Sequence, residues 1–402
     1  RRPARGAVGR CRRRMDPGAR YRDRCVRRQV DLHRRRPSGR PDRRPTAVHS
    51  PVRWWTHRRT SSAQLMPDTR TAVSEIVTGL GLYGFRDLAQ ALAARPRFIT
   101  NVDDDVYDQL DEAFASGTHT DVFRVAWANG QRFARSTDGL RGRPPWSVEW
   151  KGPHKPPAYE QIPADLRVDH VYLLSCKYGS KILQNASPAN LFDRALSERR
   201  TSSVDWFDAV APASYGEFYT EAVAHTGLTG LPADPTELDR NDRERLRKAL
   251  PGRWPAELRE QWGLVAFEIA RASADRLLDN ITAKGEREAF VWRLLRLQAA
   301  PYFVLGADLK NVPLHYRVTT PWDFRTRFAL RSVDLWGEHA GQPLVRWRVD
   351  VHDRELDTDR VVEGHVEVRW SHGKFGGVPE AKIYLDTPHH NVAGYQPLDD
   401  GS

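Results

Sequence analysis

The residues best suited to chemistry lie in one short stretch in the first half of the chain. Asp138 precedes a turn rich in Gly, Arg and Pro, and Glu149 and Lys151 follow two positions apart. Side chains at i and i+2 of a strand share a face, and the turn can fold Asp138 back beside them. Converging carboxylates bind a hard cation such as Mg²⁺ or Mn²⁺, and a nearby lysine can position water or stabilise phosphate charge. The pattern predicts metal-assisted hydrolysis of a phosphodiester.

A second set of the same residue types follows in the segment RVDHVYLLSCKY. Asp169 and the tripeptide Ser175–Lys177 have matching parity and would share one face of a continuous strand. Eight residues of such a strand span about 26 Å, too far for Asp169 and Lys177 to share a metal unless the chain bends. We therefore rank Asp169 below Asp138 as a metal ligand. Lys177 is expected to lean into the same cleft if its strand pairs with 146–151.

The first set resembles the motif of the PD-(D/E)XK, or restriction-endonuclease-like, nucleases. That family carries an Asp, a short loop and an acid-x-Lys tripeptide on the next strand of an α/β core. Here Asp138 matches the first acid, Glu149-x-Lys151 matches the tripeptide, and Thr137 stands where the family often has Pro. The resemblance covers about 115–200. Because the family tolerates replacement of the tripeptide acid, a Ser-x-Lys tripeptide is also compatible with it.

The resemblance implies a nuclease that cleaves DNA, with RNA as the open alternative, using Mg²⁺ or Mn²⁺. The implied catalytic residues are Asp138, Glu149, Lys151 and Lys177, and the implied metal ligands are Asp138, Glu149 and Asp169. The expected partner is then nucleic acid, and no association with a membrane is expected. Whether the protein forms a homodimer is left open by the sequence. Lysine usage adds a hint, because only nine of the 63 basic residues are Lys and four of these fall within 151–181. A lysine is not interchangeable with arginine.

The C-terminal region offers a different interpretation. Glu380-Ala381-Lys382 repeats the tripeptide, and a glycine-bearing loop, WSHGKF, precedes it and could contact phosphate. Tryptophans and arginines are interleaved over 321–348, a combination that can stack on and hold nucleic acid. The alternative function is therefore a non-catalytic protein that binds nucleic acid or a partner protein with its C-terminal region. An enzyme of unrelated chemistry that uses the loop and Glu380–Lys382 is a third hypothesis.

Charge is distributed unevenly along the 402 residues. The net charge is +11, but residues 1–65 alone hold 21 Arg against 4 Asp, a net of +17, so the remainder carries −6. The segment 1–65 has no apolar periodicity, and we expect it to be a disordered leader, because it cannot bury enough surface to offset its ordering entropy. We also expect that translation begins at or near Met66, so that this leader is not natural coding sequence.

Several classes are excluded by composition. No run approaches the roughly 18 apolar residues of a membrane span, and no GxxxxGK[ST], GxGxxG or GxSxG motif is present. Only Cys176 among the three cysteines lies after the leader, which excludes a disulfide framework and a cysteine-based zinc site. This cysteine usage fits a reducing, cytoplasmic location.

The elements that must position these residues follow from hydrophobic periodicity. Apolar spacing predicts helices over 69–95, 102–114, 119–136, near 188–198 and over 256–281, and strands over 146–151, 170–178, 345–351 and 362–370. The fold class is α/β, or α+β overall. We expect a nuclease-like mixed-sheet domain over 66–200, a helical region over 201–300 and an antiparallel β-rich region over 301–402.

Overall fold

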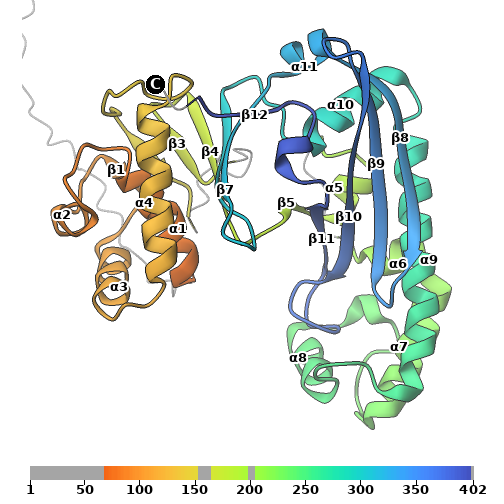
Figure 1. The fold of residues 1–402 in the computed structure, drawn as a ribbon. Coiled ribbons are helices and arrows are strands. Elements are labelled where there is room, and N and C mark those ends of the chain that lie inside the picture. The colour runs from red at the N-terminus through yellow and green to blue at the C-terminus, as the bar shows by residue number, and fades with distance from the viewer. Residues whose placement is uncertain (1–67, 153–163, 198–203, 400–402) are drawn as a thin grey trace, which may run out of the picture. The chain divides into compact units, whose positions relative to one another are not determined.

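The computed structural model describes residues 68–152, 164–197 and 204–399, so the predictions for 1–65 lie outside the described residues. Within these ranges the chain forms eleven α-helices and two β-sheets, of seven and five strands (Figure 1). The predicted mixed α/β class is confirmed. None of the helices in these ranges is both long and apolar enough to cross a lipid bilayer.

The seven-stranded sheet has the order β1-β2-β3-β4-β6-β7-β12. Its strands are β1 (Ile99–Thr100), β2 (Val148–Trp150), β3 (Leu166–Val168), β4 (Tyr172–Tyr178), β6 (Tyr302–Ala307), β7 (Pro313–Val318) and β12 (Tyr395–Pro397). Strands β2, β3 and β4 are consecutive antiparallel neighbours, and β4 pairs with β6 in parallel. A parallel pair needs a long crossover connection, and here it is the whole segment between β4 and β6.

Three residues, Asp169, His170 and Val171, join β3 to β4. Asp169 and His170 both have positive φ, 52° and 59°, and Val171 N donates to Val168 O at 3.0 Å. Positive φ at both central residues is the geometry of the turn that matches the twist of a tight hairpin. The strand predicted over 170–178 is present as β4, which begins only after this turn, so Asp169 does not continue it.

Four helices form a core with the first sheet: α1 (Thr69–Leu80), α2 (Leu88–Ala94), α3 (Asp104–Ala115) and α4 (Thr120–Arg135). The predicted helices in this region are thus present, and α4 continues as a helix through Asn129-Gly130. Gly130 lies against α1, where an added Cβ would meet Thr78 O at 2.2 Å. Only glycine allows the two helices to approach so closely.

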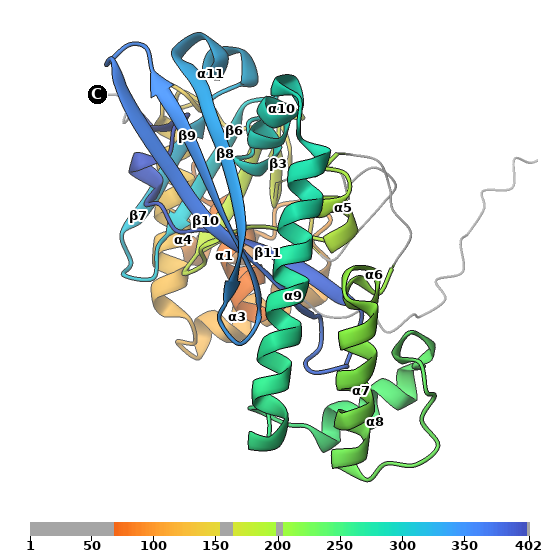
Figure 2. The ribbon, with the colours of Figure 1, turned by 90° about the vertical axis from the view of Figure 1, so that its right-hand side faces the viewer.

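The second sheet has the order β5-β11-β10-β9-β8, and all its neighbours are antiparallel. Its strands are β5 (Ile182–Ala186), β8 (Phe328–His339), β9 (Pro343–Asp353), β10 (Thr358–Trp370) and β11 (Pro379–Leu385). Alternate residues of β9 and β10 are buried, as the sequence predicts for a sheet covered on one face. The long helix α9 (Ala256–Asn280) packs on β8 and β9 (Figure 2).

The middle of the chain is helical, as predicted. Its helices are α5 (Pro188–Phe192), α6 (Trp206–Val210), α7 (Pro212–Thr226), α8 (Arg240–Ala249), α9 and α10 (Lys284–Leu294), while α11 (Pro321–Arg327) precedes β8. Short 3₁₀ turns occur at Pro235–Glu237 and His389–Asn391.

The expected boundaries near 200 and 300 match the order of helices and strands along the chain. They do not separate the two sheets, because each sheet takes strands from both sides of the helical region. Strands β6, β7 and β12 come from the C-terminal part and complete the first sheet, whereas β5 precedes the helical region and joins the second. The sheet that carries β2, β3 and β4 therefore draws on both ends of the described chain.

Candidate active site

The β3–β4 hairpin brings an acid opposite the Ser-x-Lys tripeptide. Leu166 pairs with Leu174, so Asp165, one residue before β3, lies opposite Ser175. The Asp165 Oδ2 atom accepts hydrogen bonds from Cys176 N at 2.6 Å and from Ser175 Oγ at 3.3 Å. An acid on one strand therefore faces Ser175–Lys177 on the next.

The neighbouring strand β2 brings a lysine to the same acid. Lys151 follows β2 directly, and its backbone N–H donates to Asp165 O at 2.9 Å. Asp165 thus lies between Lys151 on one side and Ser175 on the other. Lys151, one of the residues predicted to belong to the site, is thus hydrogen-bonded to Asp165, and Lys177, another, lies two residues along β4 from Ser175.

A second carboxylate comes from helix α1. Trp150 Nε1 donates to Glu75 Oε2 at 2.6 Å, which fixes this carboxyl against β2. Burial, followed by the negative charge of Asp165, raises the pKa of Glu75 to about 8, while Lys177 and Lys151 act in the opposite direction. Desolvation and a nearby like charge both disfavour the ionised form of a carboxyl. We call Glu75, Lys151, Asp165, Ser175 and Lys177 the acid–lysine cluster.

The thiol next to this cluster is not suited to nucleophilic catalysis. Burial, and then the charges of Asp165 and Glu75, raise the pKa of Cys176 well above its ordinary value. The thiolate is the reactive form of cysteine, so this side chain stays protonated near neutral pH.

Lys177 presents an available ammonium group. Its side chain makes no hydrogen bond or ion pair with another residue that the structure describes, although it is only partly exposed. Lys177 also borders a small cavity together with Arg296 and His389. Burial, and then the positive charge of Lys177, lowers the pKa of His389 to about 4, so that this histidine is neutral at pH 7.

The three predicted metal ligands have other partners. Asp138 Oδ1 lies 2.8 Å from Arg317 Nη1, where it joins the end of α4 to β7. Asp169 sits in the hairpin turn, where it lies 2.6 Å from Arg143 and accepts the backbone N–H of Trp146 at 2.6 Å. Both acids hold loops in place through these contacts, and neither contacts the acid–lysine cluster.

Glu149 is also part of an ion pair rather than of a shared carboxylate site. Its side chain is buried, lies 2.6 Å from Arg167 Nη2 on β3, and lies 2.6 Å from His170 Nδ1. In the ranges that the structure covers, no group of three His, Cys, Asp or Glu side chains is arranged to hold a metal ion. The structure thus brings together Lys151 and Lys177, but not Asp138, Glu149 and Asp169.

The spacing of residues in the sequence could have indicated Asp165, although Asp165 belongs to none of the predicted motifs. Asp165 and Ser175 are each five residues from His170, so a tight hairpin centred near that residue places them opposite each other. Glu75 had no comparable local signal, because its position depends on how α1 packs against the sheet.

The chain matches no protein-family model, no curated protein and no solved structure in the three comparisons made. The resemblance to the PD-(D/E)XK nucleases therefore stays an expectation from the sequence alone.

Proposed function

We propose that this protein hydrolyses phosphodiester bonds of DNA in a reaction that depends on Mg²⁺ or Mn²⁺, with RNA as the open alternative. The observation that carries the proposal is the contact of Asp165 with the tripeptide Ser175–Lys177 across adjacent strands. It is the arrangement implied by the nuclease resemblance, an acid followed on the next strand by a tripeptide that ends in lysine. The proposal moves the first acid from Asp138 to Asp165.

The missing acid of the tripeptide has a replacement nearby. A serine hydroxyl carries no charge, so the tripeptide is one carboxylate short of the usual acid-x-Lys. Glu75 of α1 supplies a carboxyl close enough for the charge of Asp165 to raise its pKa. The acid–lysine cluster therefore contains two acids and two lysines, the residue types that the predicted chemistry requires.

The donor set fits a hard divalent cation. Glu75 and Asp165 would hold it through carboxylate oxygens, the ligands that Mg²⁺ and Mn²⁺ prefer. Burial and the charge of Asp165 raise the pKa of Glu75 more than Lys177 and Lys151 lower it. The positive charge of the two lysines therefore does not fully compensate the two acids. When bound there, a divalent cation supplies a Lewis acid for water and phosphate oxygens.

The two lysines of the cluster have different roles in the proposed reaction. Lys177, with its available ammonium group, would hold a phosphate oxygen or the attacking water. Lys151 is fixed by its backbone hydrogen bond to Asp165 and adds positive charge beside Glu75. Positive charge placed where a transition state becomes more negative lowers its energy.

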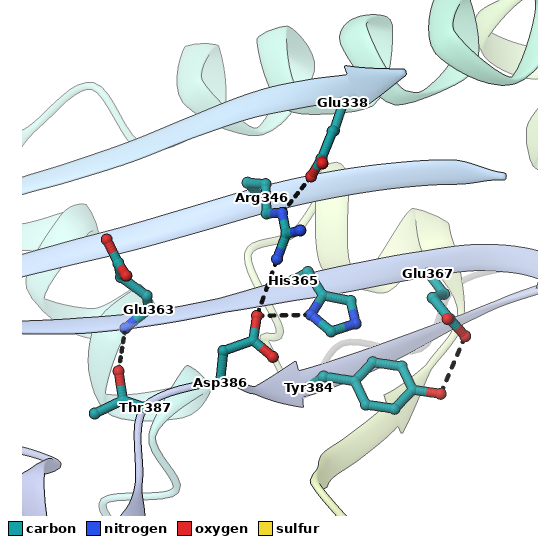
Figure 3. Close-up of polar contacts among 8 residues, drawn as sticks. All are labelled: Glu338, Arg346, Glu363, His365, Glu367, Tyr384, Asp386 and Thr387. Atoms are coloured by element: carbon teal, nitrogen blue, oxygen red, sulfur yellow. Dashed lines mark hydrogen bonds and ion pairs between the residues drawn. The ribbon is translucent and has the colours of Figure 1, made fainter. Parts of the chain in front are cut away.

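The alternative function, a non-catalytic binding protein that uses the C-terminal sheet, has less support. Figure 3 shows that charged side chains on this sheet bond to one another: Arg346 to Glu338 and Asp386, and Asp386 to His365. On the same face Tyr384 Oη donates to Glu367 at 3.0 Å. Charges that already neutralise each other contribute little to attracting a nucleic acid.

Cleavage by the full-length chain tests the proposal. We expect plasmid DNA to be nicked or linearised with Mg²⁺ or Mn²⁺ and to stay intact with EDTA, with single-stranded DNA and RNA assayed alongside. Lys177→Met should reduce the rate by about a hundredfold or more, because it removes the ammonium group from the cluster.

Lys310→Met is the matched control, because this lysine is exposed in the described β6–β7 connection and lies outside the acid–lysine cluster. Its cleavage rate should equal that of the wild type. Cleavage that persists in EDTA, or equal loss in both variants, would contradict the proposal.

A further inference from the structure

A pocket in the second half of the chain shares no residue with the acid–lysine cluster. It has a volume of about 580 Å³ and lies where β10 ends, against the end of α8. This volume is within the range of small-molecule sites in proteins. The loop Ser371–Val378 follows Trp370, the first residue of the WSHGKF motif, and its residues 371–374 form one wall of the pocket.

The loop has a fixed conformation. Phe375 in its middle is fully buried among aromatic side chains and has φ 56°, which is unusual for a residue other than glycine. Gly376 closes the loop on α8, because a Cβ there would meet His372 O at 2.6 Å and Arg247 Cδ at 2.9 Å. A strained residue persists only when its surroundings hold it, and such residues cluster at ligand sites.

The polar part of the pocket is cationic. Arg247, Arg369 and Lys374 border it, against one carboxylate, Glu367, which already accepts a hydrogen bond from Tyr384. Lys374 donates to Leu250 O at 3.2 Å, and its ammonium can make three hydrogen bonds. Burial lowers the pKa of Lys374, as expected for an amine that has lost part of its water.

The charged residues retain capacity for a further anion. Arg247 uses Nε and Nη2 for Glu244, which leaves Nη1 without a partner among the described residues. Arg369 lies 3.5 Å from Glu380 and 3.9 Å from Glu367, distances at the limit of direct pairing. Nη1 of Arg247 is thus an unused donor among the described residues, and the ammonium of Lys374, which makes one hydrogen bond to Leu250 O, keeps further capacity.

Another part of the lining is an apolar wall next to Lys374. Leu250, Pro251, Trp254 and Trp370 form it, and Lys374 lies 4.4 Å from the centre of the Trp254 ring. A ligand that complements both walls has an anionic end and a flat, less polar end. Guanidinium groups are suited to phosphate because their donors match its oxygens.

We infer that this pocket binds a nucleotide through its phosphate. The phosphate contacts Arg369, Lys374 and Arg247, and the nucleoside lies on the apolar wall. The nucleotide is either a free molecule or the phosphorylated end of a nucleic acid, since both present the same group. The inference does not depend on the proposed nuclease activity, and its test needs no cleavage.

Calorimetric titration of the full chain in EDTA tests this inference, with AMP, ATP, adenosine and inorganic phosphate as probes. Oligonucleotides with and without a 5′ phosphate are titrated in parallel. We expect AMP or ATP to bind at least about tenfold more tightly than adenosine and inorganic phosphate if the ligand is free. A phosphate-dependent preference confined to the oligonucleotides identifies a nucleic-acid end instead.

The decisive variants are Arg369→Gln and Lys374→Gln, each expected to weaken binding of the preferred probe by at least about tenfold. Arg348→Gln is the matched control: its side chain on β9 is 42% exposed, against 44% for Arg369, and it is also paired with acids but lies outside the pocket. Three results would overturn the inference: no binding by any probe at about 1 mM, adenosine binding as tightly as AMP, or unchanged binding in Arg369→Gln.

Discussion

Asp165→Asn is expected to reduce metal-dependent DNA cleavage by on the order of a thousandfold, equivalent to about 4 kcal/mol of transition-state stabilisation. Asparagine keeps the size of the side chain and an oxygen that can accept from Cys176 N, so the β3–β4 hairpin should stay intact. The substitution removes the negative charge that, with Glu75, is proposed to hold the cation. The measurement is the single-turnover rate at saturating Mg²⁺.

The control for this prediction is Asp138→Asn. Asp138 was the first acid suggested by the sequence, but in the structure it pairs with Arg317. We expect this variant to cleave within about threefold of the wild-type rate, because a partly exposed ion pair contributes little. If Asp138→Asn lost activity while Asp165→Asn kept it, the site would be the one first suggested by the sequence, and the acid–lysine cluster would be structural.

Asp353→Ala is expected to lower the free energy of unfolding by about 3–5 kcal/mol. The Asp353 carboxylate is fully buried at the end of β9 and accepts hydrogen bonds from Arg327 Nε at 3.1 Å and Nη2 at 3.0 Å. It also lies 2.9 Å from Arg360 on β10. Removing it leaves two partly buried guanidinium groups without their shared counter-charge.

Urea denaturation followed by tryptophan fluorescence measures this effect, and Asp359→Ala is its control. Asp359 lies on β10 next to Arg360 but is 73% exposed, and it is ion-paired with His352. Its replacement should change the free energy of unfolding by less than about 0.5 kcal/mol. Similar losses in the two variants would show that Asp353 does not link α11 to the sheet as its contacts indicate.

The long elements could be predicted from the sequence because each buries one face. The alternation in β9 and β10 and the apolar stripe of α9 are one-sided burial patterns that extend over several turns or residue pairs. Strand β3 has only three residues, and the turn after it uses Asp169-His170 rather than the Asn-Gly or Asp-Gly typical of such hairpins. Reading the segment as one strand therefore left Asp165, which the hairpin places opposite Ser175, unconsidered.

The candidate site was predicted in part for a related reason. Lys151 and Lys177 could be found because lysines are scarce and each ends a strand-like run. Glu75 could not, because it is 90 positions from Asp165 and only the packing of α1 brings the two carboxyls together. The same holds for the Asp138–Arg317 pair, whose members are 179 positions apart. A local sequence motif contains no information on contacts between residues so far apart in the sequence.

Binding of Mn²⁺ to the full-length protein, followed by electron paramagnetic resonance, is the most direct test of the idea that Glu75 and Asp165 share a cation. The account predicts saturable binding in the wild type and in Asp138→Asn, and at least about tenfold weaker binding in both Asp165→Asn and Glu75→Gln. Wild-type protein that binds no Mn²⁺, or binding that is unchanged in Asp165→Asn and Glu75→Gln, would contradict it.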